Sequence, residues 1–179
     1  MTIESKLADL FEVFPDLELN KGDLSILQVF RGQEPQLVAF FDGYDGEQKN
    51  EVLVFSGKNE PLGIVSFVIM ENKYKPHPNN KYARIDLVIV KNNSRNLGVG
   101  RLLTLCSIIY LLKTSGEQLY SISCLAAHEA METILKDLSF QHREVKENDF
   151  WRGELTWKGS NLEKVTCRYV ECANQYLKQ

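Results

Sequence analysis

The sequence contains an apolar run, a short polar segment with two glycines, and then a second, longer apolar run. In the first run, 83–90, Ile85, Leu87 and Ile89 occupy alternate positions, which is the two-residue period of a half-buried β-strand. The second run, 99–114, is long enough for a helix. The pattern therefore predicts a strand, a glycine turn and a helix, in that order.

Apolar runs on both sides of this segment predict further elements. The runs 51–55 and 62–70 are joined by turn-forming residues, including Gly57 and Pro61, and predict an antiparallel hairpin. Farther along the chain we predict a strand over 119–124, a helix over 126–138 and a strand hairpin over 141–146 and 154–157.

The two ends of the chain are less regular. Residues 3–14 have apolar side chains at helical spacing and predict a short amphipathic helix. The runs 24–30 and 37–41 predict either two strands or a helix followed by a strand. Residues 161–179 again show helical spacing, so we expect a C-terminal helix that packs on its own domain or, alternatively, forms a homodimer contact.

Length and charge limit the class of protein. A chain of 179 residues fits one domain, so we expect a single domain over 1–179. The formal net charge is -3 and no stripe of Lys and Arg is present, so we expect no nucleic-acid partner. The N-terminus lacks the features of a secretion signal, and the run 99–112 is shorter than the roughly 20 residues that span a bilayer. We therefore expect a cytoplasmic protein without a membrane partner.

The four cysteines indicate neither a disulfide framework nor a metal site. Cys106, Cys124, Cys167 and Cys172 form no C-x-x-C pair, and the three histidines complete no zinc-binding pattern. We expect reduced thiols, mostly in the core, and no metal.

The two glycines lie where the predicted helix begins. Gly98 and Gly100 have no Cβ to block a ligand. The first N–H groups of a helix have no intrahelical acceptor and lie at the positive end of its dipole. The turn 95–101 is therefore suited to an anion, with phosphate favoured. It lacks the third glycine of a dinucleotide-binding loop and the Gly-Lys-Ser/Thr of a triphosphate loop.

The pattern that remains is Arg-x-x-Gly-x-Gly, formed by Arg95, Gly98 and Gly100 after a strand. With it, the chain resembles the GNAT superfamily of N-acetyltransferases, whose acetyl-CoA pattern is Arg/Gln-x-x-Gly-x-Gly/Ala in the same setting. Residues 138–140, Leu-Ser-Phe, stand where that family usually has Leu-Gly-Phe, and the resemblance covers roughly residues 50–158. It implies a mixed α/β fold: a twisted, mostly antiparallel sheet with one splayed parallel strand pair, flanked by helices, and followed here by the C-terminal helix.

The resemblance also assigns acetyl-CoA, as co-substrate, to this part of the chain. The diphosphate would lie on the backbone amides of the turn, and the pantetheine would bond to the backbone of the preceding strand as an added strand does. A histidine falls where the family often has an asparagine that contacts CoA. The residues assigned to the co-substrate are Val88, Ile89, Val90, Arg95, Asn96, Leu97, Gly98, Val99, Gly100, Arg101 and His128.

Asp86 has two interpretations. Aspartate is disfavoured in strands, and burying its charge is costly unless it is paired, so an ion pair with Arg84 or Lys81, or exposure to solvent, would make it purely structural. The resemblance instead implies a catalytic general base, because some family members carry an acidic residue on this strand. That role would be helped if partial burial raised the pKa of the carboxyl towards neutrality.

The chain departs from the family at Leu135, where many members have the tyrosine that protonates the leaving thiolate. A leucine has no proton to give. Solvent, or a residue among Tyr120, Ser123 and Cys124, would have to replace it.

These observations predict an N-acetyltransferase that transfers an acetyl group by direct attack of a primary amine, carried by a small molecule or a peptide. One alternative is a catalytically reduced acyl-CoA-binding or regulatory protein of the same fold. Another is an interaction protein in which Gly98 and Gly100 only make a turn. The predicted loops 42–50 and 71–81 carry no pattern that identifies the acceptor.

Overall fold

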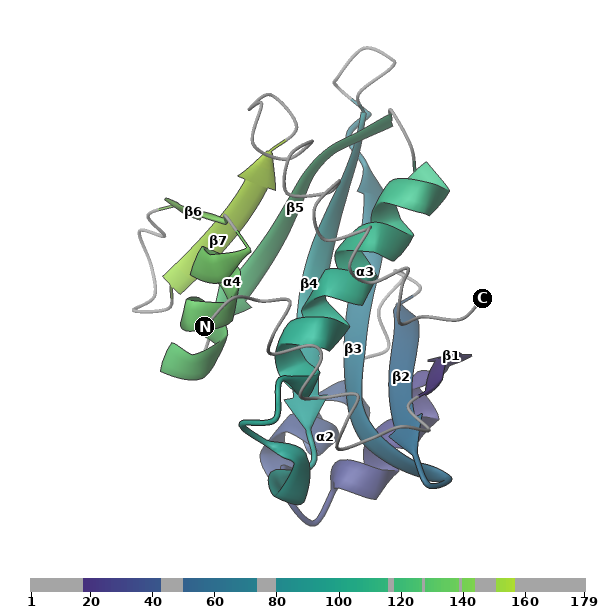
Figure 1. The fold of residues 1–179 in the computed structure, drawn as a ribbon. Coiled ribbons are helices and arrows are strands. Elements are labelled where there is room, and N and C mark those ends of the chain that lie inside the picture. The colour runs from purple at the N-terminus through teal and green to yellow at the C-terminus, as the bar shows by residue number, and fades with distance from the viewer. Residues whose placement is uncertain are drawn as a thin grey trace. The chain divides into compact units, whose positions relative to one another are not determined.

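The computed structural model describes residues 18–42, 50–73, 80–115, 118–126, 128–138, 140–143 and 151–156. In hydrogen-bonded order the strands are β1 (Glu18–Gly22), β2 (Glu51–Gly57), β3 (Glu60–Glu71), β4 (Lys81–Val90), β5 (Leu119–Ala126), β7 (Trp151–Thr156) and β6 (Gln141–Arg143) (Figure 1). The helices are η1 (Leu24–Phe30), α2 (Pro35–Asp42), η2 (Asn92–Ser94), α3 (Val99–Ser115) and α4 (Glu129–Asp137). The chain falls into two compact units, one drawn from residues 1–68 and 87–104 and the other from 69–86 and 105–179.

In the first unit, β1, β2 and β3 pair antiparallel. The loop between β2 and β3 consists of Lys58 and Asn59, whose φ angles are 53° and 63°. Two such residues form a type I′ turn, which matches the twist of the strands it joins. The predicted hairpin is confirmed, with a turn of two residues.

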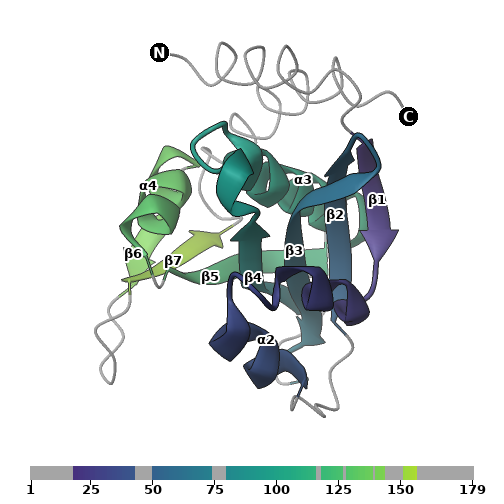
Figure 2. The same cartoon turned by 90° about the horizontal axis from the view of Figure 1, so that it is seen from below.

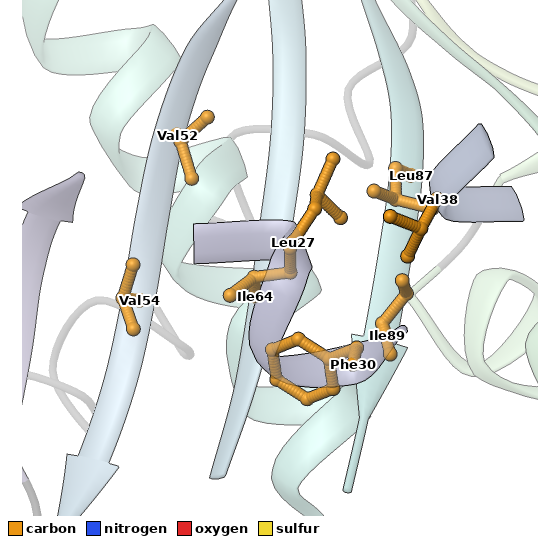
Figure 3. Close-up of a cluster of buried hydrophobic side chains, with 8 residues drawn as sticks. All are labelled: Leu27, Phe30, Val38, Val52, Val54, Ile64, Leu87 and Ile89. Atoms are coloured by element: carbon orange, nitrogen blue, oxygen red, sulfur yellow. The ribbon is translucent and has the colours of Figure 1, made fainter. Parts of the chain in front are cut away.

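The helices η1 and α2 cover one face of the strands of this unit (Figure 2). Leu27 and Phe30 of η1 and Val38 of α2 are buried there. Figure 3 shows them against side chains from β2, β3 and β4, which are Val52, Val54, Ile64, Leu87 and Ile89. Removing this apolar surface from water fixes the two helices on the sheet.

The prediction of at least one strand within 24–41 is wrong, because both runs are helical. Short apolar runs do not distinguish a strand from a helix, and two local residues decide the outcome here. The Asp23 carboxylate accepts a hydrogen bond from the backbone N–H of Ser25 at 2.8 Å and caps η1. Pro35 occupies the first position of α2, where its missing N–H costs nothing.

The start of α3 lies on the opposite face of the same strands. Neighbouring residues of a strand point to opposite faces, so Gly63 faces away from the cluster that contains Ile64. A Cβ built on Gly63 would lie 2.8 Å from the carbonyl oxygen of Ile89, 2.8 Å from Cδ1 of Leu103 and 3.2 Å from Cγ1 of Val99. The first turn of α3 therefore packs directly on the backbone of β3.

In the second unit, the parallel pairing of β4 with β5 runs from Lys81–Leu119 to Ile85–Cys124. The strand β7 pairs antiparallel with β5 on one side and with β6 on the other. This parallel pair within a mostly antiparallel sheet confirms the predicted fold class.

The predicted strands at 83–90 and 119–124, the helices at 99–114 and 126–138 and the hairpin of 141–146 with 154–157 are present with shifted ends. β1 was not predicted, because four of its five residues are exposed and show no apolar alternation. The predicted helices at 3–14 and 161–179 and most of the loops at 42–50 and 71–81 lie outside the described residues. Among the described helices, none has both the length and the apolar character needed to cross a membrane.

The close packing at Gly63 gives a stability prediction. We expect Gly63→Ala to lower the free energy of unfolding by about 1–3 kcal/mol, because the new methyl group would press on the backbone carbonyl of Ile89, which cannot rotate away. Gly32→Ala is the matched control, since no atom lies within 4 Å of its Cβ position, and we expect a change within about 0.5 kcal/mol. Urea unfolding of both variants measures these changes. Equal decreases in the free energy of unfolding would contradict the packing argument.

Candidate functional site

The turn between β4 and α3 begins at Lys91 and passes through η2. Asn96 has a φ angle of 64° and Gly98 one of 90°. This left-handed region is open to glycine at no steric cost and is tolerated by asparagine. The conformation of the turn therefore explains why a glycine stands at position 98.

The first helical hydrogen bond of α3 runs from the N–H of Leu102 to the carbonyl oxygen of Gly98 at 3.0 Å. The amides of residues 99–101 precede it, and amides in the first turn of a helix lack intrahelical acceptors. Residues 95–97 are exposed, with Leu97 at 37%. The positive end of the helix dipole thus lies behind an accessible turn, an arrangement that can hold a phosphate group.

The Arg95 side chain, which the sequence assigned to the co-substrate, points back to its own unit. Its Nη2 lies 2.7 Å from Oε1 of Glu34, and its Nε donates to the carbonyl oxygen of Val90 at 3.3 Å. In this arrangement the backbone of the turn is the part presented to an anion. Arg101 is half-buried in the first turn of α3.

Gln33 also contacts this turn, which the sequence analysis did not foresee. Its Nε2 donates to the carbonyl oxygen of Val90 at 2.8 Å, and its Oε1 accepts from the N–H of Asn92 at 2.7 Å. The partners are 57 and 59 positions away along the chain, so no local pattern could have identified them. One amide side chain thus bridges the end of β4 and the start of η2.

The predicted alternation along β4 is confirmed. Ile85, Leu87 and Ile89 are buried, while the intervening positions, Arg84, Asp86, Val88 and Val90, are half-buried. These four positions share one face of the strand.

In the second unit, Asp86 forms an ion pair with Arg84, the arrangement that the structural interpretation predicted. Its side chain is 12% exposed, and Arg84 is 38% exposed. The pairing of β4 with β5 ends at Ile85–Cys124, one residue before Asp86. The ion pair explains how this carboxylate is tolerated on the strand, and the role of Asp86 as a base stays a prediction.

The surroundings of Cys124, Ser123 and Leu135 decide how well each could act as the missing proton donor. Burial, with a further contribution from the charge of Asp86, raises the pKa of the Cys124 thiol to about 12. Such a thiol is a poor acid for a CoA thiolate, whose own thiol has a pKa near 8.5. The hydroxyl of Ser123 is buried and donates to the carbonyl oxygen of Ala83 at 3.4 Å. Leu135 is fully buried, so this position is a core position of α4.

His128 lies directly before α4 and is exposed. Its carbonyl oxygen accepts the first helical hydrogen bonds, from the N–H groups of Met131 at 3.0 Å and Glu132 at 3.1 Å. Its side chain makes no capping hydrogen bond, so the imidazole is at the surface of the second unit.

Solved structures share this fold at low sequence identity. AtaTR bound with acetyl-CoA matches with a TM-score of 0.61 at 13% identity, over 85% of this chain and 98% of that one. NAA60 of Arabidopsis thaliana in complex with acetyl-CoA matches with a TM-score of 0.60 at 13% identity, over 80% and 99%. A Bacillus subtilis acetyltransferase in complex with CoA matches with a TM-score of 0.56 at 16% identity, over 79% and 99%. No protein-family model and no curated protein matches the sequence.

The expectation of a small-molecule or peptide acceptor and no nucleic-acid partner is wrong. Solved structures of this fold include AtaT complexed with acetyl-methionyl-tRNAfMet and a KacTA–DNA complex, and AtaT is also solved with the C-terminus of the antitoxin AtaR. Net charge is a sum over the whole chain and does not describe the electrostatic potential at one face. A net charge of -3 therefore excludes neither a nucleic-acid partner nor a protein partner.

The two described cysteines are free and buried, as the sequence predicted, and this gives a test of their pKa values. Burial raises the pKa of Cys106 to about 12, as for Cys124. Because only thiolates react readily, we expect iodoacetamide at pH 8.5 to modify both at least about 100-fold more slowly in the native protein than in urea. Peptide mass spectrometry separates them from Cys167 and Cys172, which lie outside the described residues. If Cys106 and Cys124 reacted in the native protein about as fast as in urea, their thiols would not be buried with raised pKa values.

Proposed function

We propose that this chain, which has the fold of the GNAT acetyltransferases, binds acetyl-CoA at the turn 95–101 and transfers the acetyl group to an amine. The observation that carries the proposal is the turn itself: Gly98, at a φ angle of 90°, leads from β4 into the first turn of α3. The fold gives independent support, since proteins of this fold are solved with acetyl-CoA or CoA.

The diphosphate fits the backbone of the turn. The amides from Leu97 to Arg101 supply donors, and the helix dipole favours the negative charge. Because Arg95 is engaged by Glu34, its side chain would add a contact only by exchanging partners. The chain's contribution here is to hold and orient the co-substrate.

The pantetheine is assigned to the backbone of β4 at Val88, Ile89 and Val90. The carbonyl oxygen of Val90 has two lone pairs, and it already accepts from Gln33 and from Arg95. In this arrangement the carbonyl oxygen of Val90 is already occupied, so acceptors for the pantetheine amides would come from the residues before it.

Asp86 is the proposed general base. It precedes Val88 by two positions on the same half-buried face of β4, about 7 Å along the strand. Its ion pair with Arg84 orients the carboxylate. An ionised carboxylate can accept the proton of an attacking amine, directly or through one water molecule.

The departing thiolate needs no side-chain acid in this proposal. Leu135 cannot supply a proton, and the raised pKa of Cys124 makes that thiol a poor donor. A thiol with a pKa near 8.5 can take its proton from solvent at neutral pH.

The acceptor is best sought among amines carried by macromolecules. AtaT, which shares this fold, is solved with acetyl-methionyl-tRNAfMet, so aminoacyl-tRNA belongs in an acceptor panel. A chain that binds acetyl-CoA yet releases no CoA with any acceptor would fit the alternative of a regulatory acyl-CoA-binding protein.

Binding of acetyl-CoA should raise the unfolding temperature of the purified protein. At ligand about 100-fold above its dissociation constant, linkage adds about 2.7 kcal/mol, which corresponds to roughly 5–10 °C for a chain of this size. Differential scanning fluorimetry with acetyl-CoA, and with NAD as the control ligand, measures the shift. Equal shifts with both ligands, or none at millimolar acetyl-CoA, would contradict binding at this turn.

Replacing the proposed base should impair turnover without impairing binding. We expect Asp86→Asn to lower kcat by about 100-fold or more, because an amide cannot accept the amine proton, and to leave the Kd for acetyl-CoA within about twofold. Activity of the variant should recover partly at high pH, where the amine is already neutral. Asp137→Asn, at an exposed position at the end of α4, is the matched control. Unchanged turnover of Asp86→Asn across the pH range would remove Asp86 from the mechanism.

A further inference from the structure

We propose that Gln33 is a positioning residue for the acetyl-CoA turn. The inference rests on the proposed function and goes beyond it, because Gln33 lies outside the glycine pattern and on a different segment of the first unit. It would touch neither the co-substrate nor the acceptor in this role. It would act by holding the backbone of Val90 and Asn92, on either side of Lys91, where β4 ends and η2 begins.

Both polar atoms of the Gln33 side-chain amide make a hydrogen bond to the backbone. Nε2 donates to the carbonyl oxygen of Val90 at 2.8 Å and Oε1 accepts from the N–H of Asn92 at 2.7 Å. These two backbone groups are two positions apart, as on one edge of a strand, so the Gln33 side chain bonds to them as a neighbouring strand would. Glutamate, when ionised, could make only the second bond, and methionine could make neither.

Gln33 is itself fixed by the core of the first unit. Its backbone N–H donates to the carbonyl oxygen of Phe30 at 3.0 Å, and the N–H of Glu34 donates to the same oxygen at 2.8 Å. Phe30 is 1% exposed and belongs to the apolar cluster on β2, β3 and β4 (Figure 3). A buried aromatic residue therefore holds the peptide that presents Gln33 to the turn.

Two ion pairs also hold the path from β4 to α3, one from the segment of Gln33 and one from β3, but they are weaker anchors. Glu34 pairs with Arg95, and Glu60 pairs with Lys91 at 2.6 Å. Both pairs are substantially exposed to solvent, where water and salt screen them. The bond from Gln33 to Val90 is part-buried, and neither bond of Gln33 joins opposite charges, so salt should not screen them. They should therefore keep the end of β4 and the start of η2 in place when the ion pairs are screened.

The expected consequence is specific to the diphosphate. Amides bind an anion well only if they are held in one orientation before it arrives. Loss of the Gln33 bridge should loosen the path from Val90 into η2 and so the turn that follows. A ligand with the diphosphate should then lose affinity, whereas a ligand without it should not.

The test compares Gln33→Met and Gln33→Glu with wild type. Titration calorimetry, at a temperature well below the unfolding transition of each variant, gives the Kd for acetyl-CoA. We expect Gln33→Met to raise this Kd roughly tenfold, as two lost hydrogen bonds allow, and Gln33→Glu to raise it less. Gln36→Met is the matched control, because Gln36 is exposed on α2, and its Kd should equal that of wild type.

Two further readouts separate positioning from a general loss of structure. The Kd for S-acetylpantetheine, which has no diphosphate, should be the same in Gln33→Met and wild type by the same calorimetry. Amide hydrogen exchange of Asn92, without ligand, should be faster in Gln33→Met and unchanged in Gln36→Met. An unchanged Kd for acetyl-CoA, or equal losses for acetyl-CoA and S-acetylpantetheine, would overturn the proposal.

Failure of the proposed function would look different. In that case the wild-type protein itself would show no affinity for acetyl-CoA, and the proposal for Gln33 would fall with it. If the wild type binds acetyl-CoA, and Gln33→Met, Gln33→Glu and Gln36→Met bind it equally well, the proposed function stands. The positioning role of Gln33 is then refuted.

Discussion

The close approach of α3 to β3 at Gly63 is the constraint on which the first unit depends. No side chain larger than hydrogen fits between β3, the carbonyl of Ile89 and the side chains of the first helical turn. This contact fixes where α3 starts. Because the dipole and the unbonded amides of a helix lie at its start, the same contact fixes where the chain can present them to an anion. On the other face, Leu27, Phe30 and Val38 hold η1 and α2 against the strands, opposite the first turn of α3.

The parts of the fold that local periodicity determines were predictable. The strand at 81–90, the glycine turn and the helix at 99–115 follow from alternating apolar positions, from two glycines and from a long apolar run. The segment 24–41 was not predictable at this level, because a short apolar run suits a strand or a helix, and the choice rests on a cap at Asp23 and on Pro35. At the candidate site, the backbone features were visible in the sequence, whereas Gln33 and Glu34 were not. They reach the turn through tertiary contacts that span 57 to 61 positions.

Asp86 shows why a structural and a functional role need not exclude each other. Its ion pair with Arg84 explains how a carboxylate is tolerated on a strand, and the same contact orients the carboxylate on the half-buried face of β4. The net charge of the chain was less informative than this one contact. A sum over 179 residues says little about any single surface, and structures of the same fold are solved with DNA and with tRNA.

The composition of β1 has a consequence for solubility. Among the described strands, β1 lies at the end of the sheet next to β2, whose residues are mostly buried and apolar. An unprotected β2 would offer another chain a row of open hydrogen-bonding groups flanked by apolar side chains, the pattern from which edge-to-edge aggregation begins. In place of that row, β1 presents Glu18, Asn20 and Lys21 to water. This short polar strand contributes little apolar burial, and its value to the protein lies in the association that it prevents.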